Sequence, residues 1–299
     1  MSEDTLRREN GKTASPAPRL PLGQRWRYRL GQTGLRAPLV QWQHRGVRPT
    51  DVFIGAYPRS GCTWLRFMLF EIIMGRGAQF TEVDAMLPPV GRHAQAATPL
   101  PNNGRLMVTH EIYRRVYRKA IYITRDARDV AVSEFMREKA KGVVQTFDAY
   151  LTDFVAGKKR HGSWTKHLSS WLDSDIAREG NLIAIKYEDM HARPFETLVA
   201  VTKFLGLEAD PERITNAIRS NTMKHMQKKE DVAQGEYGGN LVLTFSGQGE
   251  NGRFVRKGEV GGWRSQLTKE QASRIELHEA TGLVRMGYSP SCLPPASGA

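Results

Sequence analysis

The chain has 299 residues, a formal net charge of +13 at pH 7 and two cysteines. That length can bury one substantial α/β core, and two cysteines argue against a disulfide framework. The positive charge would suit nucleic acid, but the sequence has no recognition helix, zinc-ligand spacing or aromatic-basic repeat. We therefore expect no nucleic-acid partner and interpret the charge as an attraction for a polyanionic cofactor.

The first 45 residues differ in character from the rest of the chain. Their many Lys and Arg residues are interspersed with Pro, Ser and Gly, a composition typical of disorder. We predict a basic, partly disordered extension over residues 1–45, one domain over 46–288 and a loose tail over 289–299. No apolar run reaches the length of a membrane span, since Arg66 and Glu71 interrupt the longest one, and an apolar signal core is lacking. These features predict a cytoplasmic protein without a membrane span.

Strand-like and helical segments alternate through the predicted domain. Apolar runs predict four buried strands, at 52–56, 105–109, 120–124 and 182–186. Apolar residues at helical spacing predict helices at 65–74, from Asp126 onward, and at 143–156, 164–178, 195–205 and 211–219. This order predicts a single α/β domain with a central parallel β-sheet flanked by helices, in which ligands bind at the carboxyl ends of the strands.

The segment 57–64 reads Tyr-Pro-Arg-Ser-Gly-Cys-Thr-Trp and joins the first predicted strand to a helix. Such a loop presents backbone N–H groups and a helix N-terminus to an anion, as a P-loop does. The hydroxyls of Ser60 and Thr63 and the charge of Arg59 would add to that site. It is not a nucleoside-triphosphatase loop, because Cys62 stands where that motif has a lysine. By itself, the segment could also be an ordinary turn between a strand and a helix.

Two further segments favour a phosphate site over an ordinary turn. Arg125 follows the third predicted strand and Ser133 lies on the next predicted helix, so both side chains can reach one anion. The segment 254–263, Phe-Val-Arg-Lys-Gly-Glu-Val-Gly-Gly-Trp, combines the cations Arg256 and Lys257 with three glycines. A loop of that composition can close over a phosphate with side chains and N–H groups together.

These segments resemble the motifs of the sulfotransferase family that uses 3′-phosphoadenosine 5′-phosphosulfate (PAPS). Residues 57–64 resemble its 5′-phosphosulfate loop, Tyr-Pro-Lys-Ser-Gly-Thr-Thr-Trp. Arg125 and Ser133 keep the spacing of its 3′-phosphate motif, and residues 256–263 resemble its C-terminal motif, Arg-Lys-Gly-x-x-Gly-Asp-Trp. The motifs occur in the family's order within residues 52–268. The resemblance implies a cytosolic-type sulfotransferase domain with a P-loop-like phosphosulfate loop.

The resemblance also implies which residues hold the co-substrate PAPS, or its product 3′-phosphoadenosine 5′-phosphate (PAP), without a metal ion. Trp64 and Tyr187 would contact the adenine, although each would otherwise be interpreted as core packing. Thr222 and Met223 match a Ser-Phe pair on the other side of the base. The predicted cofactor-binding residues are Arg59, Ser60, Gly61, Cys62, Thr63, Trp64, Arg125, Ser133, Tyr187, Thr222, Met223, Arg256, Lys257 and Gly258.

The predicted general base is His110, at the end of the strand-like segment Leu-Met-Val-Thr-His. A histidine near its unperturbed pKa can take the proton of an attacking hydroxyl at neutral pH. The family's base ends such a strand, so the resemblance implies this catalytic role for His110; the alternative is a structural histidine. Arg59 replaces the family's loop lysine and would neutralise charge on the leaving phosphate. Val108 and Gly262 also depart from the family's pattern, where a lysine and an aspartate stand.

The predicted function is transfer of a sulfonate group from PAPS to a hydroxyl of a small-molecule acceptor. We expect acceptor contacts from residues 88–104, 111–118 and 228–252, the last of them mobile. The cations between 114 and 119 could contact an acidic or sugar acceptor or be solvated. Two alternatives stay open: a protein that binds PAPS or PAP without catalysis and, with less support, an ATP-dependent phosphotransferase. The family's dimer motif is not intact around 264–273, so the oligomeric state is open.

Overall fold

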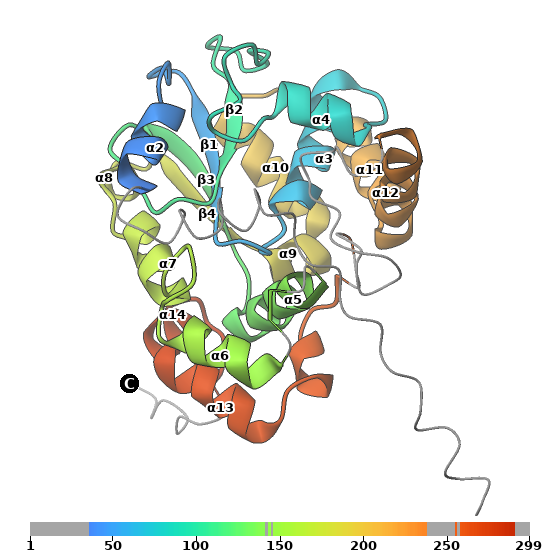
Figure 1. The fold of residues 1–299 in the computed structure, drawn as a ribbon. Coiled ribbons are helices and arrows are strands. Elements are labelled where there is room, and N and C mark those ends of the chain that lie inside the picture. The colour runs from blue at the N-terminus through green and yellow to red at the C-terminus, as the bar shows by residue number, and fades with distance from the viewer. Residues whose placement is uncertain (1–35, 141–142, 145, 238–254, 256–257, 291–299) are drawn as a thin grey trace, which may run out of the picture.

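The structure, a computed structural model, has a four-stranded parallel sheet with the strand order β2-β1-β3-β4 (Figure 1). It describes residues 36–290, apart from 141–142, 145, 238–254 and 256–257. The predicted parallel sheet is therefore confirmed, and each strand lies within one residue of its predicted bounds. The strands are β1 (Val52–Ala56), β2 (Leu106–Thr109), β3 (Lys119–Thr124) and β4 (Leu182–Lys186).

Successive residues of a strand point to opposite faces of the sheet, and helices cover both faces here, so both are buried. On β1, Val52, Ile54 and Ala56 pack into one core cluster, and Phe53 packs into the other. Figure 1 shows helices on both sides of the sheet. The first face is covered by α3 (Cys62–Met74), α4 (Phe80–Met86), α10 (Pro194–Leu205), α11 (Pro211–Ser220) and α12 (Met223–Tyr237). The second is covered by α5 (Ala127–Ala140), α6 (Phe147–Val155), α7 (Trp164–Leu172), α8 (Asp175–Arg178), α13 (Lys269–His278) and α14 (Ala280–Arg285).

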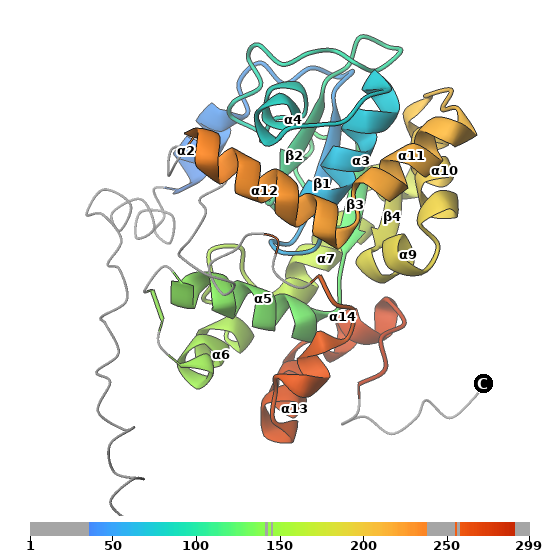
Figure 2. The ribbon, with the colours of Figure 1, turned by 90° about the vertical axis from the view of Figure 1, so that its right-hand side faces the viewer.

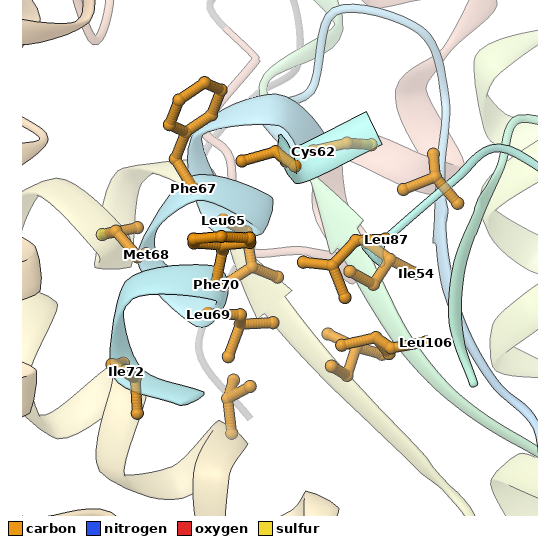
Figure 3. Close-up of a cluster of buried hydrophobic side chains, with 14 of the residues drawn as sticks. Ile54, Cys62, Leu65, Phe67, Met68, Leu69, Phe70, Ile72, Leu87 and Leu106 are labelled. Atoms are coloured by element: carbon orange, nitrogen blue, oxygen red, sulfur yellow. The ribbon is translucent and has the colours of Figure 1, made fainter. Parts of the chain in front are cut away.

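Helix α3 is apolar on nearly all sides because it lies between the sheet and outer helices. Leu65, Leu69 and Phe70 face Ile54 of β1 in the cluster that Figure 3 shows. Full burial of one such side chain stabilises the fold by about 1.5–3 kcal/mol. The helix ends at Gly75, whose φ of 67° closes a left-handed cap. Its packing therefore holds the first turn of α3, which adjoins the predicted phosphosulfate loop, on a rigid support.

Several predicted helices have different bounds in the structure. Helix α3 begins at Cys62, three residues before the predicted start. The predicted helix at 164–178 is interrupted, since α7 ends at Leu172 and the Ser174 hydroxyl caps a new helix by accepting a hydrogen bond from the Ala177 N–H. Helix α6 begins at Phe147 after a Thr146 cap. Capping side chains therefore set helix boundaries that cannot be predicted from the spacing of apolar residues.

The segment 228–252, predicted as mobile, is helical over its first ten residues, which continue α12 to Tyr237. Met226, Glu230 and Ala233 are buried on that helix, and Lys229 Nζ lies 2.5 Å from the Glu71 carboxylate of α3. Tertiary packing on α3 and α4 therefore overrides the glycine and charge content of the segment. Residues 238–252 lie outside the described residues.

The predicted extension over residues 1–45 lies outside the described residues up to residue 35, as does the predicted tail from residue 291. Its last part forms α2 (Arg36–Gln43), where Val40 is buried. Arg36 Nη2 lies 2.6 Å from the Glu111 carboxylate, so α2 is joined to the loop that follows β2. The other elements are α9 (Tyr187–Ala192) and a short 3₁₀ helix, η4 (Gly262–Ser265). No helix in the described part of the chain combines the length and apolar content that crossing a bilayer requires.

Candidate active site

A cavity of about 620 Å³ opens at the carboxyl ends of β1, β2 and β3. Arg59, His110 and Arg125, each of which follows one of these strands, line it together with Ser133 and Arg137 of α5. Figure 2 shows α12 above and α5 below the loop that follows β1. Because parallel strands end at the same edge of a sheet, segments far apart in the sequence meet at this cavity.

The loop between β1 and α3 has the backbone shape of an anion cradle. Arg59 and Gly61 have φ angles of 71° and 100°, in the left-handed region. A Cβ on Gly61 would lie 2.5 Å from the Tyr187 ring, so both conformation and space require glycine there. The N-cap residue of α3 is Gly61, so no N-cap side chain accepts a hydrogen bond from the first N–H groups of the helix. The Ser60 hydroxyl is buried without a hydrogen-bond partner among the described residues. These donors fit an anionic ligand in the loop.

The predicted 3′-phosphate residues Arg125 and Ser133 both line the same cavity. Arg59 Nε donates a hydrogen bond to Ser133 Oγ at 3.0 Å, which joins the loop to α5. The Arg125 guanidinium lies over the Tyr187 ring at 4.4 Å, and its Nη2 donates to the Glu259 carbonyl at 2.7 Å. Arg125 Nε is buried and has no described hydrogen-bond partner. Arg256 and Lys257 lie outside the described residues.

The predicted adenine contacts lie next to Arg125 and the loop, around Tyr187. The Tyr187 hydroxyl donates to the Gly258 carbonyl at 2.8 Å. Gly258 has a φ of 62°, and a Cβ there would lie 1.8 Å from Met223 Cε. Trp64 lines the cavity, and its indole Nε1 donates to the Asn221 carbonyl at 2.7 Å. Thr222, unlike Met223, does not line the cavity.

Cys62 and Thr63 contribute differently to the first turn of α3. Burial raises the pKa of the Cys62 thiol to about 12, so it is uncharged at neutral pH. Cys62 therefore offers an anion two neutral donors, its weak S–H group and its backbone N–H. Thr63 lines the cavity with a half-buried side chain.

His110 reaches the cavity from the end of β2. Its Nδ1 lies 2.8 Å from the Ala56 carbonyl oxygen, which can only accept a hydrogen bond. The ring proton is therefore on Nδ1, and Nε2 keeps its lone pair. The pKa of His110 is lowered to about 4, mainly by burial and also by the charges of Arg137 and Arg160, against the opposing effect of the hydrogen bond to Ala56. The expectation of an unperturbed histidine pKa is wrong, because dehydration and two cations oppose protonation.

Sequence reasoning missed three other side chains beside His110. His161 and Arg137 line the cavity, and His167 lies behind it. His167 Nε2 donates to the His110 carbonyl at 3.1 Å, while its Nδ1 accepts from the Tyr122 hydroxyl at 3.0 Å. Burial lowers the pKa of His167 to about 3. No local motif marks these residues, because only the packing of α5 and α7 against the sheet brings them to His110.

The expected acceptor segments contribute less of the cavity wall than predicted. Of residues 88–104, only 89–92 line it, and of 111–118 only Glu111 does. The cations between 114 and 119 do not line it, and Lys119 lies over the Phe204 ring at 4.6 Å. Trp42 and Gln43 of α2 line it instead, so the end of the predicted extension helps to form the site.

The sulfotransferase domain family model matches residues 49–281. The chain belongs to this family, as the motifs predict, and its class is that of sulfotransferase enzymes. It is 29% identical over 255 residues to Sulfotransferase 1A1 of Bos taurus, covering 78% of this chain and 83% of that protein. It is 25% identical over 246 residues to an amine sulfotransferase of Oryctolagus cuniculus, covering 77% and 79%.

Two solved structures that hold PAP share the fold. Mouse sulfotransferase SULT7A1, complexed with PAP, has a TM-score of 0.61 at 23% identity, with 83% of this chain and 91% of that chain covered. Retinol dehydratase in a complex with retinol and PAP has a TM-score of 0.63 at 19% identity, with 86% and 88% covered. The predicted α/β architecture is thereby confirmed, whereas the roles of individual site residues stay predictions.

Proposed function

We propose that this protein transfers a sulfonate group from PAPS to a hydroxyl of a small-molecule acceptor. One observation carries the proposal: a single cavity contains both an uncapped phosphate-type loop and a histidine whose Nε2 can accept a proton. The loop provides anion donors through Ser60 and the start of α3, and His110 lies at the end of the neighbouring strand β2. Family membership supports this reaction, and relatives in solved structures hold PAP.

The cavity offers matched groups to each part of PAPS. The loop donors would hold the 5′-phosphosulfate, and Arg59 would neutralise charge on the phosphate. Arg125 and Ser133 would hold the 3′-phosphate, and Trp64 and Tyr187 would flank the adenine. When bound, PAPS supplies an activated sulfonyl group whose bond to the 5′-phosphate breaks as the acceptor oxygen attacks sulfur in line.

His110 is the general base of the proposal. Its Nδ1–H is held by the Ala56 carbonyl and its own carbonyl by His167, so Nε2 has a defined direction. A base of low pKa stays neutral over a wide pH range, but it is a weaker proton acceptor than one whose pKa lies near the operating pH. Proton removal by a positioned base typically contributes about 10²–10⁴-fold in rate.

Two alternatives have less support. A protein that binds PAPS or PAP without catalysis would not need a histidine oriented with a free Nε2 in the cavity. An ATP-dependent phosphotransferase would use a lysine after Gly61, where this chain has Cys62. We also propose that the protein is cytoplasmic and that its catalytic domain spans residues 46–288.

The decisive experiment incubates the protein with PAPS carrying labelled sulfate and a panel of phenols, sugars, steroids and natural products. We expect labelled product with at least one hydroxyl acceptor, and transfer that persists in a metal chelator. PAP at about 100 times its Kd should stabilise the fold by about 2.7 kcal/mol, and AMP, which lacks the 3′-phosphate, by much less. Equal stabilisation by AMP, PAP and ATP, together with no transfer, would overturn the proposal.

A further inference from the structure

The cavity wall around His110 carries more cations than carboxylates. We use the term acceptor side for the lining residues at 84, 89–92, 108–111, 137 and 160–161. Two carboxylates lie on this side, and each is already paired: Glu111 with Arg36 and Asp84 with Arg66, both at 2.6 Å. The other two lining carboxylates, Asp129 and Glu259, belong to residues that contact Arg125 and lie outside this set. The remaining charged residues on this side are cations.

Arg137 is the central cation of the acceptor side. It lies on α5 one turn beyond Ser133, and residues four apart share a helix face, so both reach the cavity. Its side chain is half-buried, and it forms no ion pair with any residue that the structure describes. Its Nε is buried with no hydrogen-bond partner in the same part of the chain. A guanidinium with an unused buried donor favours an anion bound in the cavity.

Arg160 adds a second cation to this wall from the loop between α6 and α7. Its backbone is held in place because Arg36 Nη1 donates to the Arg160 carbonyl at 2.8 Å. Arg137 and Arg160 line the same cavity as His110, and the charge of each lowers the pKa of His110. The neighbouring walls, Val90, Val108 and Val132, are apolar and can accept a carbon skeleton.

We infer that the acceptor is a hydroxyl compound that also carries an anionic group, such as a carboxylate, which Arg137 binds with support from Arg160. The inference rests on the proposed function and specifies its substrate class. A guanidinium binds a carboxylate through two parallel hydrogen bonds. The apolar walls would hold the carbon skeleton between the anionic group and the hydroxyl at His110. The basic run between 114 and 119 has no such role, because it lies outside the cavity.

The test compares acceptors that differ only in charge. para-Hydroxybenzoate, para-hydroxyphenylacetate and para-hydroxyphenylpropanoate are each paired with the primary amide of the same acid, and kcat/KM for sulfonation is measured. The added thermal stabilisation of the PAP complex by each compound gives a second readout. We expect the carboxylate to be preferred by about 10- to 100-fold in at least one pair, as charge-assisted hydrogen bonds provide.

The variant Arg137→Gln should reduce the preference for the carboxylate to about onefold. The variant Arg137→Lys should retain part of the preference, because lysine keeps the charge but lacks the paired donors of the guanidinium. Arg118→Gln is the matched control: it removes the same charge from an exposed position outside the cavity and should leave the preference as in the parent.

Three results would overturn the inference. One is that neither readout favours the carboxylate in any pair. Another is that Arg137→Gln and Arg118→Gln change the preference equally. The third is that Arg137→Gln weakens PAP binding and affects all acceptors alike, which would assign Arg137 to the cofactor. Sulfonation of the amides without preference for the acids overturns only the acceptor class, whereas absence of both transfer and PAP stabilisation overturns the proposed function as well.

Discussion

His110 Nδ1 donates a hydrogen bond of 2.8 Å to the carbonyl oxygen of Ala56. Ala56 is the last residue of β1 and His110 directly follows β2, so the bond joins two adjacent parallel strands at their carboxyl ends. It fixes the ring tautomer and leaves Nε2 as the proton acceptor. The orientation of the predicted base is therefore fixed by the backbone at the carboxyl end of the neighbouring strand β1.

Replacing the predicted base should separate catalysis from cofactor binding. His110→Ala should lower kcat by about 10²–10⁴-fold, while the Kd for PAP stays close to that of the parent, because the predicted cofactor contacts lie elsewhere in the cavity. Turnover and PAP titration measure the two effects. His278→Ala, which removes an exposed histidine of α13, serves as the control. Near-normal kcat in His110→Ala would assign proton removal to another group.

The pH dependence should report the low pKa of His110. The base is active when neutral, and burial lowers its pKa to about 4. With an aliphatic hydroxyl acceptor, kcat/KM should therefore persist well below pH 6.5 and fall only as the pH approaches 4. Arg137→Gln removes one of the charges that lower this pKa, so its acid limb should move to higher pH. An acid limb centred at 6.5 in the parent would contradict the buried setting of His110.

We expect a side chain at position 258 to weaken cofactor binding by its bulk, beyond any effect of backbone strain. Gly258→Ala places a Cβ against Met223 at a φ of 62°, next to the carbonyl that Tyr187 binds. We expect weaker PAP binding by titration calorimetry. Gly206→Ala is the control, because its φ of 74° imposes a similar strain with nothing within 4 Å of the new Cβ. Equal PAP affinity in the two variants would remove Gly258 from the predicted site.

The contact between Arg59 and Ser133 should connect cofactor binding with turnover. Arg59→Ala should lower both PAP affinity and kcat, because it removes the loop's cation. Ser133→Ala removes one hydrogen bond, worth about 0.5–1.5 kcal/mol, and should weaken PAP binding by up to about tenfold. Arg48→Ala, at an exposed site outside the cavity, should change neither quantity. An Arg59→Ala variant that keeps full PAP affinity would contradict the predicted role.

Buried histidines should make the fold sensitive to acid. His167 has a pKa of about 3 in the fold, so between pH 6.5 and 3 the unfolded chain binds a proton that the fold does not. Stability present above pH 6.5 is thus lost as the pH falls, by about 2 kcal/mol at pH 5 for this residue. The free energy of unfolding is measured with urea at pH 7.5 and at pH 5. Between these two pH values, it should fall by about 2 kcal/mol less in His167→Gln than in the parent.

Comparing variant with parent isolates this effect from Glu134, which acts in the opposite direction. Burial raises the pKa of Glu134 to about 7, so protonation of that carboxyl stabilises the fold as the pH falls. An identical pH dependence in the parent and His167→Gln would show that His167 binds a proton as readily in the fold as in the unfolded chain.

Local chemistry in the sequence determined the strands, the loop 57–64 and the enzyme family. The strands are short apolar runs with every residue of β1 buried, so composition alone marks them. The loop is a contiguous motif whose role depends on adjacent residues, Arg59 to Thr63. These features can be predicted from the sequence because each depends only on residues that are close together in the chain.

The tertiary structure alone decided the chemistry around His110. Arg137 comes from α5, Arg160 from the loop before α7 and His167 from α7 itself. Only the packing of these segments against the sheet surrounds the base with cations and partly buries it. The same holds for α12, whose contacts with α3 stabilise a helix that its own sequence does not indicate. Dehydration and the meeting of distant charges depend on which segments pack together, and no local pattern in the chain encodes that.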